Sequence, residues 1–168
     1  MYDSLTLLPN RSAFYAWLER ALDPPDLPAP IITVVFLDVD DFTSLNTTFG
    51  QQIGDVVLRT VAARLTAAIG YGDMVGRLSN DEFGCVMIGV PPPDQFQRIT
   101  KALRAAISAP MAIGALDFTV HASIGIVSSA ASGSSANSLM ERAARDMYRA
   151  KLNGPGCAPF ESRVRPHQ

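Results

Sequence analysis

The 168-residue chain has little cysteine, no long apolar run and no excess of basic residues. Its two cysteines, Cys85 and Cys157, are too few for a disulfide framework, so we expect a reducing compartment, the cytoplasm. No apolar stretch approaches the roughly eighteen residues of a transmembrane segment, and the first residues do not resemble a signal peptide. A formal net charge of −2 argues against a broad nucleic-acid surface, which needs a basic stripe.

The chain does have an ordinary globular composition, with 48% hydrophobic and 18% charged residues. Its length fits one domain with a sizeable core. We expect this domain to span residues 1–160 and residues 161–168 to form a flexible tail. The domain begins at once, with no sensor or linker before it, and we expect other domains of a longer protein to accompany it.

Apolar periodicity and turn residues predict alternating helices and strands. Helices are expected at residues 10–22, at a short segment ending at 49, at 54–68 after a break at Gly50, at 94–108, and at 137–154 with Asn137 as cap and Gly154 as stop. A buried strand is expected at 31–40, and hairpins at 75–89 and at 111–129, the second with its turn near 115–117. This order predicts an α+β fold with helices on the faces of a sheet.

Acidic residues gather at two of these predicted elements. Asp38, Asp40 and Asp41 end the buried strand, and Asp81 and Glu82 occupy the tip of the first hairpin. If the hairpin pairs beside the strand, the carboxylates converge, and their repulsion requires a cation or a raised pKa. Oxygen ligands suit Mg²⁺, and two such ions can clamp a phosphoryl centre. Solvated turn residues and helix caps are the alternative, and spacing alone does not decide between the two.

Five segments carry a resemblance to a known family. They are DSLTLLPNR at 3–11, DVDDFTSLNTTFGQQIGDVVL at 38–58, RLSNDEF at 77–83, VHASIGI at 120–126 and ARDMYRAKLNG at 144–154. In this order they resemble the motifs of the GGDEF family, the diguanylate cyclase domains, and they cover nearly the whole chain. The resemblance implies a nucleotidyl cyclase or palm-like α+β fold with a central, mainly antiparallel sheet flanked by helices.

The family joins two GTP molecules into cyclic di-GMP, with one nucleotide on each of two facing protomers. The resemblance therefore implies GTP as substrate, Mg²⁺ or Mn²⁺ as cofactor and a homodimer. It implies that Asp38, Asp81 and Glu82 are the catalytic carboxylates. The same three residues would bind the metal, together with the backbone carbonyl of Val39.

The resemblance also implies a set of nucleotide contacts. Asn46 and Asp55 would read guanine, since a carboxylate can accept both N1–H and N2–H of that base. Lys151 would contact the phosphates, and Phe42 would support the phosphate loop. In the family, the hairpin turn lies against the nucleotide, so Ser79 and Asn80 would border the substrate.

Several positions depart from the family pattern. Ser79 and Asn80 replace the two glycines of the signature; we expect Asn80 to preserve the turn, because Asn tolerates positive φ, while its side chain crowds the substrate. Thr43 and Pro155 replace basic phosphate contacts, which leaves Lys151. Further departures are Leu7 for glycine, and Thr47 for aspartate and Gln51 for histidine, of which the last two are expected to matter less directly. The family also has a product-inhibition motif R-x-x-D, whose Asp lies four residues before the Arg of the signature. Asp73 keeps this spacing to Arg77, but Gly70 occupies the Arg position of the motif, so we expect no product-inhibition site of that kind.

These departures leave three functional hypotheses. The first is a degenerate, catalytically impaired domain that binds GTP or acts as a regulatory module in cyclic di-GMP signalling. The second is a slow but active diguanylate cyclase, favoured by the intact carboxylates. The third is a purely structural interaction domain in which the nucleotide cleft has collapsed.

Overall fold

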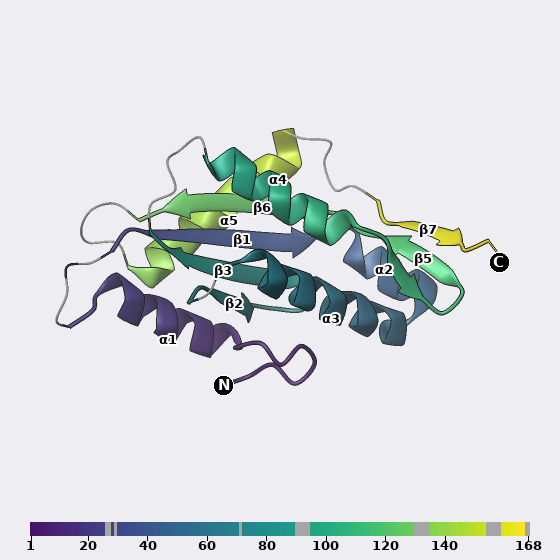
Figure 1. The fold of residues 1–168 in the computed structure, drawn as a ribbon, viewed down its shortest axis with the longest axis horizontal. Coiled ribbons are helices and arrows are strands. Elements are labelled where there is room, and N and C mark those ends of the chain that lie inside the picture. Colours follow the sequence, from purple (N-terminus) through teal and green to yellow (C-terminus); the bar gives the residue numbers. More distant parts are fainter. Residues whose placement is uncertain are drawn as a thin grey trace.

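The computed structural model describes the chain except residues 26, 27, 29, 71, 90–94, 130–134, 154–158, 167 and 168, and at Asn153 only the backbone. Helices and strands alternate along it, which confirms the α+β class (Figure 1). None of the described helices combines the length and apolar character that crossing a bilayer requires.

The main sheet consists of four antiparallel strands, which in spatial order are Met74–Arg77 (β2), Glu82–Ile88 (β3), Ile32–Val39 (β1) and Ala122–Ser128 (β6). β1 pairs with β3 on one side and with β6 on the other. The prediction of a central strand at 31–40 is therefore confirmed, as is the hairpin predicted at 75–89.

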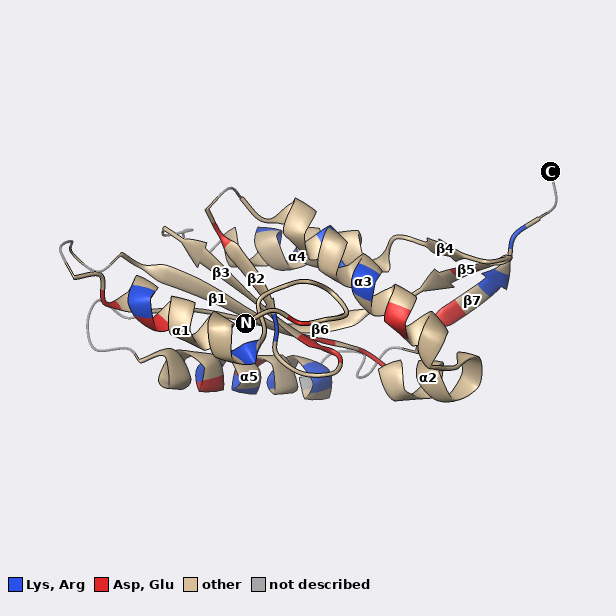
Figure 2. Cartoon of the chain, turned by 90° about the horizontal axis from the view of Figure 1, so that it is seen from below, with Lys and Arg blue, Asp and Glu red and all other residues tan. Residues whose placement is uncertain are grey.

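Helices cover both faces of this sheet (Figure 2). One layer consists of Arg11–Leu22 (α1) and Ala136–Asn153 (α5), and the opposite layer of Gln51–Ala68 (α3) and Gln95–Ser108 (α4). Each layer forms its own hydrophobic core against the strands. α1 and α4 confirm two of the predicted helices.

Alternate side chains of β1 face the two layers, as its pleat requires. Val34 and Phe36 belong to the core under α1 and α5, whereas Val35 and Leu37 belong to the core under α3 and α4. Asp38 continues the first series, so its carboxylate lies on the side of α1 and α5. Hydrophobic packing thus decides which helices can reach this acid.

A small second sheet projects beside the main one. It consists of Met111–Ile113 (β4), Leu116–Thr119 (β5) and Glu161–Val164 (β7) (Figure 1). The prediction of one hairpin over 111–129 is wrong, because the β4–β5 turn lies at Gly114 and Ala115, and the chain then leaves this sheet to form β6 beside β1. Residues 161–164, expected in a flexible tail, pair with β5 as an antiparallel strand.

Two helix starts also differ from the prediction. A short helix at Phe42–Phe49 (α2) is confirmed, but α3 begins directly after Gly50 instead of at residue 54. Gly50 has φ of 91°, which suits the sharp change of direction between the helices. The cap of α5 is Ser135, whose hydroxyl oxygen accepts from the amide of Ser138 at 3.1 Å, and not Asn137. The stop expected at Gly154 lies outside the described residues.

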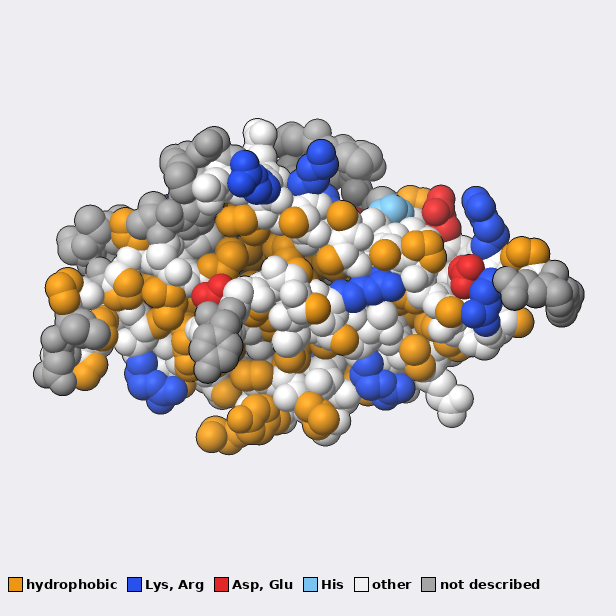
Figure 3. Space-filling model, viewed as in Figure 1, with side chains coloured by type: hydrophobic (Ala, Val, Ile, Leu, Met, Phe, Trp, Pro, Cys, Tyr) orange, Lys and Arg blue, Asp and Glu red, His pale blue; other side chains and the backbone are white. Residues whose placement is uncertain are grey.

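Charged side chains are dispersed over the face that Figure 3 shows. Lys and Arg side chains lie there among hydrophobic and uncharged ones and form no continuous stripe. This face therefore lacks the basic track by which proteins follow a nucleic-acid backbone.

Leu7 lies in a tight turn near the N-terminus with φ of 61°, in the left-handed region that favours glycine. The carbonyl of Asp3 accepts from its amide at 2.9 Å, and the Asp3 carboxylate accepts from the Thr6 amide at 2.8 Å. Leu7 is 74% exposed, so its side chain gains little from burial. A residue with a Cβ costs about 1–2 kcal/mol in this conformation.

Replacing this residue by glycine should stabilise the fold. In Leu7→Gly the relief of strain exceeds the added backbone entropy of the unfolded chain, which is about 0.5–1 kcal/mol. We expect a melting temperature about 1–4 °C higher by differential scanning calorimetry. Leu7→Ala keeps the Cβ and is the matched control; an equal rise in both variants would show that backbone strain at Leu7 is not the cause.

Candidate functional site

The register of β1 against β3 brings acidic residues to one end of the sheet. Asp38 lies directly opposite Glu82, and the amide of Val39 donates to the carbonyl of Asp81 at 3.0 Å. The hairpin tip therefore lies beside the end of β1, as the sequence predicted. The acidic side chains gathered at these two elements nevertheless have different partners.

Asp38 and Asp81 are close enough for their carboxylates to interact. Burial and then the negative charge of Asp81 raise the pKa of Asp38 to about 6, from an ordinary value of 3.8. Lys151 opposes this shift, because its Nζ lies 3.0 Å from Asp38 Oδ2. The side chains of Lys151 and Asp38 are only 22% and 14% exposed.

Glu82 and Asp40 have other partners. The hydroxyl of Ser79 donates to Glu82 Oε1, and Asp40 is 3% exposed and accepts from the hydroxyl of Ser123 at 2.6 Å. In the part of the chain that the structure describes, no three acidic, histidine or cysteine side chains come close enough to hold a metal ion together. Metal ligands were expected at Asp38, Val39, Asp81 and Glu82. The structure brings together one pair of these carboxylates, Asp38 and Asp81.

That pair fits a divalent cation by its chemistry. Asp38 and Asp81 supply the hard oxygen donors that Mg²⁺ and Mn²⁺ prefer. A divalent ion between the carboxylates would remove the repulsion that helps to raise the Asp38 pKa. When bound, such an ion would draw negative charge from a phosphoryl group.

The Ser79–Asn80 turn adopts ordinary backbone angles. Among the described residues, the non-glycine residues with positive φ are Leu7 and Asp41, so the expectation that Asn80 relies on a tolerance of positive φ is wrong. The turn closes through the carbonyl of Glu82, which accepts from the amides of Leu78 and Ser79 at 2.8 and 3.3 Å. Replacing the two glycines therefore leaves this turn without backbone strain.

Arg77 clamps the turn from the side, a role that the sequence did not reveal. Its Nε and Nη2 donate to the carbonyls of Ser79 and Asn80 at 3.2 and 2.8 Å. Its Nη1 lies 3.0 Å from both carboxylate oxygens of Asp3. The N-terminal segment thereby fixes the hairpin tip, although Asp3 and Arg77 are 74 positions apart.

A cleft of about 270 Å³ lies between α2, α3 and the turn. It is lined by Phe42, Asn46, Thr47, Gln51, Asp55, Leu58 and Asn80. The structure thus brings together four of the expected nucleotide contacts, Phe42, Asn46, Asp55 and Asn80. Thr47 and Gln51, which we expected to matter less directly, also line the cleft.

Asn46 owes its position to Gly54. A Cβ at Gly54 would lie 1.8 Å from Asn46 Oδ1 and 3.1 Å from the ring of Phe42, so a larger residue would displace both side chains. Asn46 Oδ1 is buried and has no hydrogen-bond partner within the described residues. A buried oxygen of this kind costs free energy unless a ligand or water donates to it.

A second cleft, of about 390 Å³, lies on the N-terminal side of the turn. It is lined by Asp3, Asn10, Arg11, Ser12, Arg77, Leu78, Ser79 and Asn80. Ser79 belongs to this cleft, whereas Asn80 borders both. The signature turn therefore separates two polar hollows, and Asn80 lies where they meet.

Close packing of α5 on β6 positions Lys151 in the site. A Cβ at Gly125 would lie 2.1 Å from the carbonyl oxygen of Ala143, so only glycine allows this approach. The Asp146 carboxylate accepts from the amide of Ile126 at 2.9 Å and ties the helix to the strand. Lys151 comes from the last turn of this helix and meets Asp38 across 113 positions of sequence.

Asp73, the acid that remains of the product-inhibition motif, has structural partners. Its Oδ1 accepts from the amide of Ile88 at 3.1 Å, and its own amide donates to the carbonyl of Gly70 at 3.2 Å. Asp73 thus joins the loop before β2 to the end of β3. Arg77, the arginine of the signature segment, pairs with Asp3 and with the turn.

A family model described as "Diguanylate cyclase, GGDEF domain" matches residues 1–157. The chain belongs to the GGDEF domain family. The bifunctional diguanylate cyclase/cyclic di-GMP phosphodiesterase MucR of Pseudomonas aeruginosa is 34% identical over 163 residues, which are 96% of this chain and 24% of MucR. The response regulator PleD of Caulobacter vibrioides is 32% identical over 155 residues, 90% of this chain and 34% of PleD. The chain thus spans a quarter to a third of these relatives.

Solved GGDEF domains share its fold. The GGDEF domain of TpbB (YfiN) from Pseudomonas aeruginosa superposes with a TM-score of 0.84 and 30% identity, over 92% of this chain and 90% of that one. The GGDEF domain of DgcB from Caulobacter crescentus, solved in complex with c-di-GMP, gives a TM-score of 0.82 and 28% identity, over 91% of each chain. The predicted family and fold are confirmed.

The raised pKa of Asp38 predicts a pH dependence of stability in this GGDEF domain. Between about pH 4 and pH 6 the folded state binds more protons at Asp38 than the unfolded state does, so the free energy of unfolding falls as pH rises. After allowance for solvent screening, we expect wild type to lose about 1–2 kcal/mol over this window relative to Asp38→Asn.

The measurement is urea unfolding in EDTA at pH 4, 5, 6 and 7. Asp117→Asn, which removes an acid from β5, is the matched control and should keep the wild-type slope. Parallel pH profiles for wild type and Asp38→Asn would contradict the assignment.

Proposed function

We propose that this GGDEF domain binds GTP as a regulatory module in cyclic di-GMP signalling and that its condensation chemistry is impaired. The observation that carries the proposal is the cleft in which Asn46 and Asp55 lie together, with Asn46 Oδ1 buried and unpartnered within the described residues. Similar proteins such as MucR are several times longer, so we place the module within a longer signalling protein.

The cleft has the chemistry to select guanine. The Asp55 carboxylate can accept from N1–H and N2–H of guanine, a pair of donors that adenine does not offer. The side-chain amide of Asn46 can complement another polar edge of the base. At about 270 Å³ the cleft is open, which counts against the hypothesis of a collapsed, purely structural domain.

The phosphate end of the site is weaker than the base end. Thr43, which stands in place of a lysine, is exposed on α2 and carries no charge. Lys151 is therefore the cation that remains for the phosphates, and it lies on Asp38. Fewer charge-assisted contacts would hold the triphosphate less firmly in the reactive geometry.

Asn80 supports impaired chemistry for a second reason. Asn80 borders both clefts, at the position where the family has glycine and the backbone of the turn lies against the nucleotide. A displacement of the α-phosphate by about 1 Å can reduce a rate about a hundredfold. Binding of the base would depend on Asn46 and Asp55, which α2 and α3 supply, and would tolerate this displacement.

A slow, active diguanylate cyclase is the second candidate. It is favoured by the convergence of Asp38 and Asp81 and by the unstrained turn that Arg77 clamps. This candidate also requires a homodimer, because the reaction joins nucleotides held by two protomers. TpbB, a diguanylate cyclase of Pseudomonas aeruginosa, is 34% identical over 110 residues.

Guanine recognition is tested by isothermal titration calorimetry with Mg²⁺. Wild type should bind GTP more tightly than ATP, and Asp55→Ala should weaken GTP binding about tenfold or more, because a charged hydrogen-bond partner is lost. Asp117→Ala, outside the cleft, is the control and should bind as wild type. Absence of heat at millimolar GTP in wild type would refute the binding module.

Catalysis is tested by chromatography of the products. Concentrated protein is incubated overnight with GTP and Mg²⁺, then with Mn²⁺, and Asp81→Ala serves as the blank. We expect GTP to remain unchanged in both samples. Cyclic di-GMP formed by wild type and not by the blank would establish the slow cyclase in place of the impaired module.

A further inference from the structure

The ion pair between Lys151 and Asp38 occupies the position that a metal ion needs. Lys151 Nζ lies 3.0 Å from Asp38 Oδ2, on the acid whose neighbour is Asp81. An ammonium group is the one positive charge that the chain itself brings to this carboxylate in the described structure. It relieves part of the repulsion that a divalent ion would otherwise relieve.

The position of Lys151 is built into the packing of α5. Gly125 lets the helix backbone approach β6, and Asp146 ties the two elements together through the amide of Ile126. Lys151 follows Asp146 by five residues and is mostly covered, with 22% of its side chain exposed. The helix thus holds the lysine at Asp38, so the pair does not depend on a chance rotamer at the surface.

A divalent ion and the ammonium group compete for the charge of Asp38, because Lys151 Nζ already lies on Oδ2. Mg²⁺ binds carboxylate oxygens at about 2.0–2.1 Å, which would place it within a few ångströms of Lys151 Nζ. Two cations at that distance repel each other in a partly buried site. Metal binding therefore favours release of Asp38 by the lysine, and a triphosphate offers the lysine a new anionic partner.

We propose that Lys151 is a built-in competitor for the divalent cation, which keeps metal off Asp38 until a nucleotide triphosphate draws the lysine away. Only the second half of the proposal, the withdrawal of Lys151 by a nucleotide triphosphate, rests on the GTP-binding function proposed above. Metal and nucleotide then bind as a coupled pair, since each favours the same displaced position of Lys151. Such coupling is reciprocal and typically amounts to about 5–150-fold in affinity.

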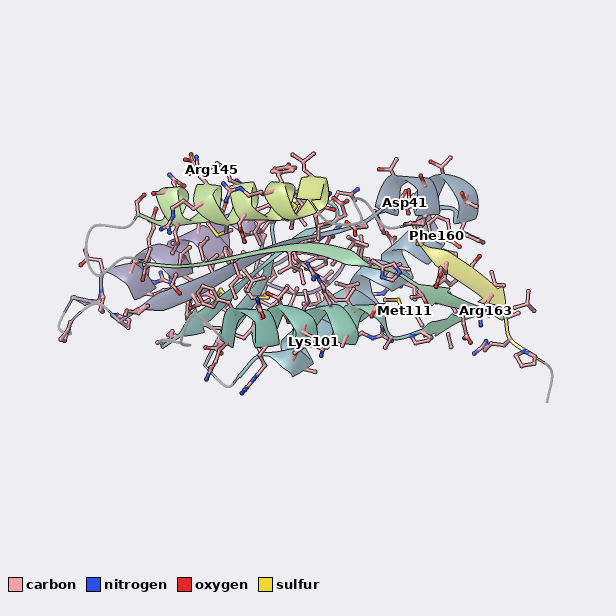
Figure 4. All side chains as sticks on the ribbon, turned by 90° about the horizontal axis from the view of Figure 1, so that it is seen from above. Asp41, Lys101, Met111, Arg145, Phe160 and Arg163 are labelled. Carbon is pink, nitrogen blue, oxygen red and sulfur yellow. The ribbon has the colours of Figure 1, made fainter. Side chains whose placement is uncertain are left out.

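The first half is tested with Mn²⁺ alone, without nucleotide, by electron paramagnetic resonance titration. Lys151→Met removes the charge and keeps a long apolar stem. We expect it to bind Mn²⁺ about tenfold or more tightly than wild type. Arg145→Met is the matched control, because Arg145 lies on the outer side of the same helix, away from the α2 end of the molecule where Asp41 lies (Figure 4). It should match wild type within about twofold.

Three results would overturn the competition. They are equal Mn²⁺ affinity in wild type and Lys151→Met, an equal gain in Arg145→Met, which would reveal a general charge effect, and a gain that persists in the Asp38→Asn/Lys151→Met double variant. Thermal melts establish that each variant is folded, and Lys151→Gln replaces the Met variant if that does not fold. Because no nucleotide is present, failure of GTP binding in calorimetry leaves this test unaffected.

Discussion

The antiparallel register of β1 against β3 brings carboxylates together, and the arrangement of the rest of the site depends on their mutual repulsion. It places Asp38 opposite Glu82 and fastens Asp81 to the backbone of Val39. A shift of one residue would turn Val34 and Phe36 out of their core, so the hydrophobic layers fix this register. The proximity of the carboxylates is therefore a consequence of core packing, and positive charge must come from the chain or from a ligand.

Two glycines make the room that side chains of the site need. Gly125 admits the backbone of α5 to the sheet and so brings Lys151 to Asp38, while Gly54 leaves room for Asn46 against α3. Each acts by the absence of a Cβ, not by an unusual backbone angle. The family's glycines are not equivalent in this respect: the Ser79–Asn80 turn has no positive φ, whereas Leu7 has one. Loss of glycine therefore costs backbone strain at Leu7, whereas the Ser79–Asn80 turn keeps ordinary backbone angles.

The sequence predicted the elements whose own residues carry the signal. The β-branched run that became β1 and the hairpin around Asp81 were recognisable because burial on both faces and a polar tip leave clear patterns. The boundary between β5 and β6 was not, since apolar alternation continues across residues 116–128 while the chain changes sheets. β7 could not be predicted either, because all four of its residues are exposed and show no alternation.

The same distinction applies to the site. The expectation that Asn46 and Asp55 read guanine came from resemblance, and the geometry gives these two residues a common cleft. The Arg77–Asp3 clamp and the Lys151–Asp38 pair join residues 74 and 113 positions apart, and no local pattern reports such contacts. The redirection of Glu82 to Ser79 is likewise a result of the substitution itself, because glycine has no hydroxyl to donate.

Binding and chemistry place unequal demands on this architecture. Recognition of a base needs a cleft of the right polarity, which is lined here mainly by residues of α2 and α3, with Asn80 at its border. Condensation would also need the α-phosphate, the carboxylate pair and a second nucleotide in register. The Arg77 clamp holds the backbone of the turn through the carbonyls of Ser79 and Asn80. In the function proposed above, a turn held in this way would not yield to the substrate, and nucleotide binding would outlast catalysis.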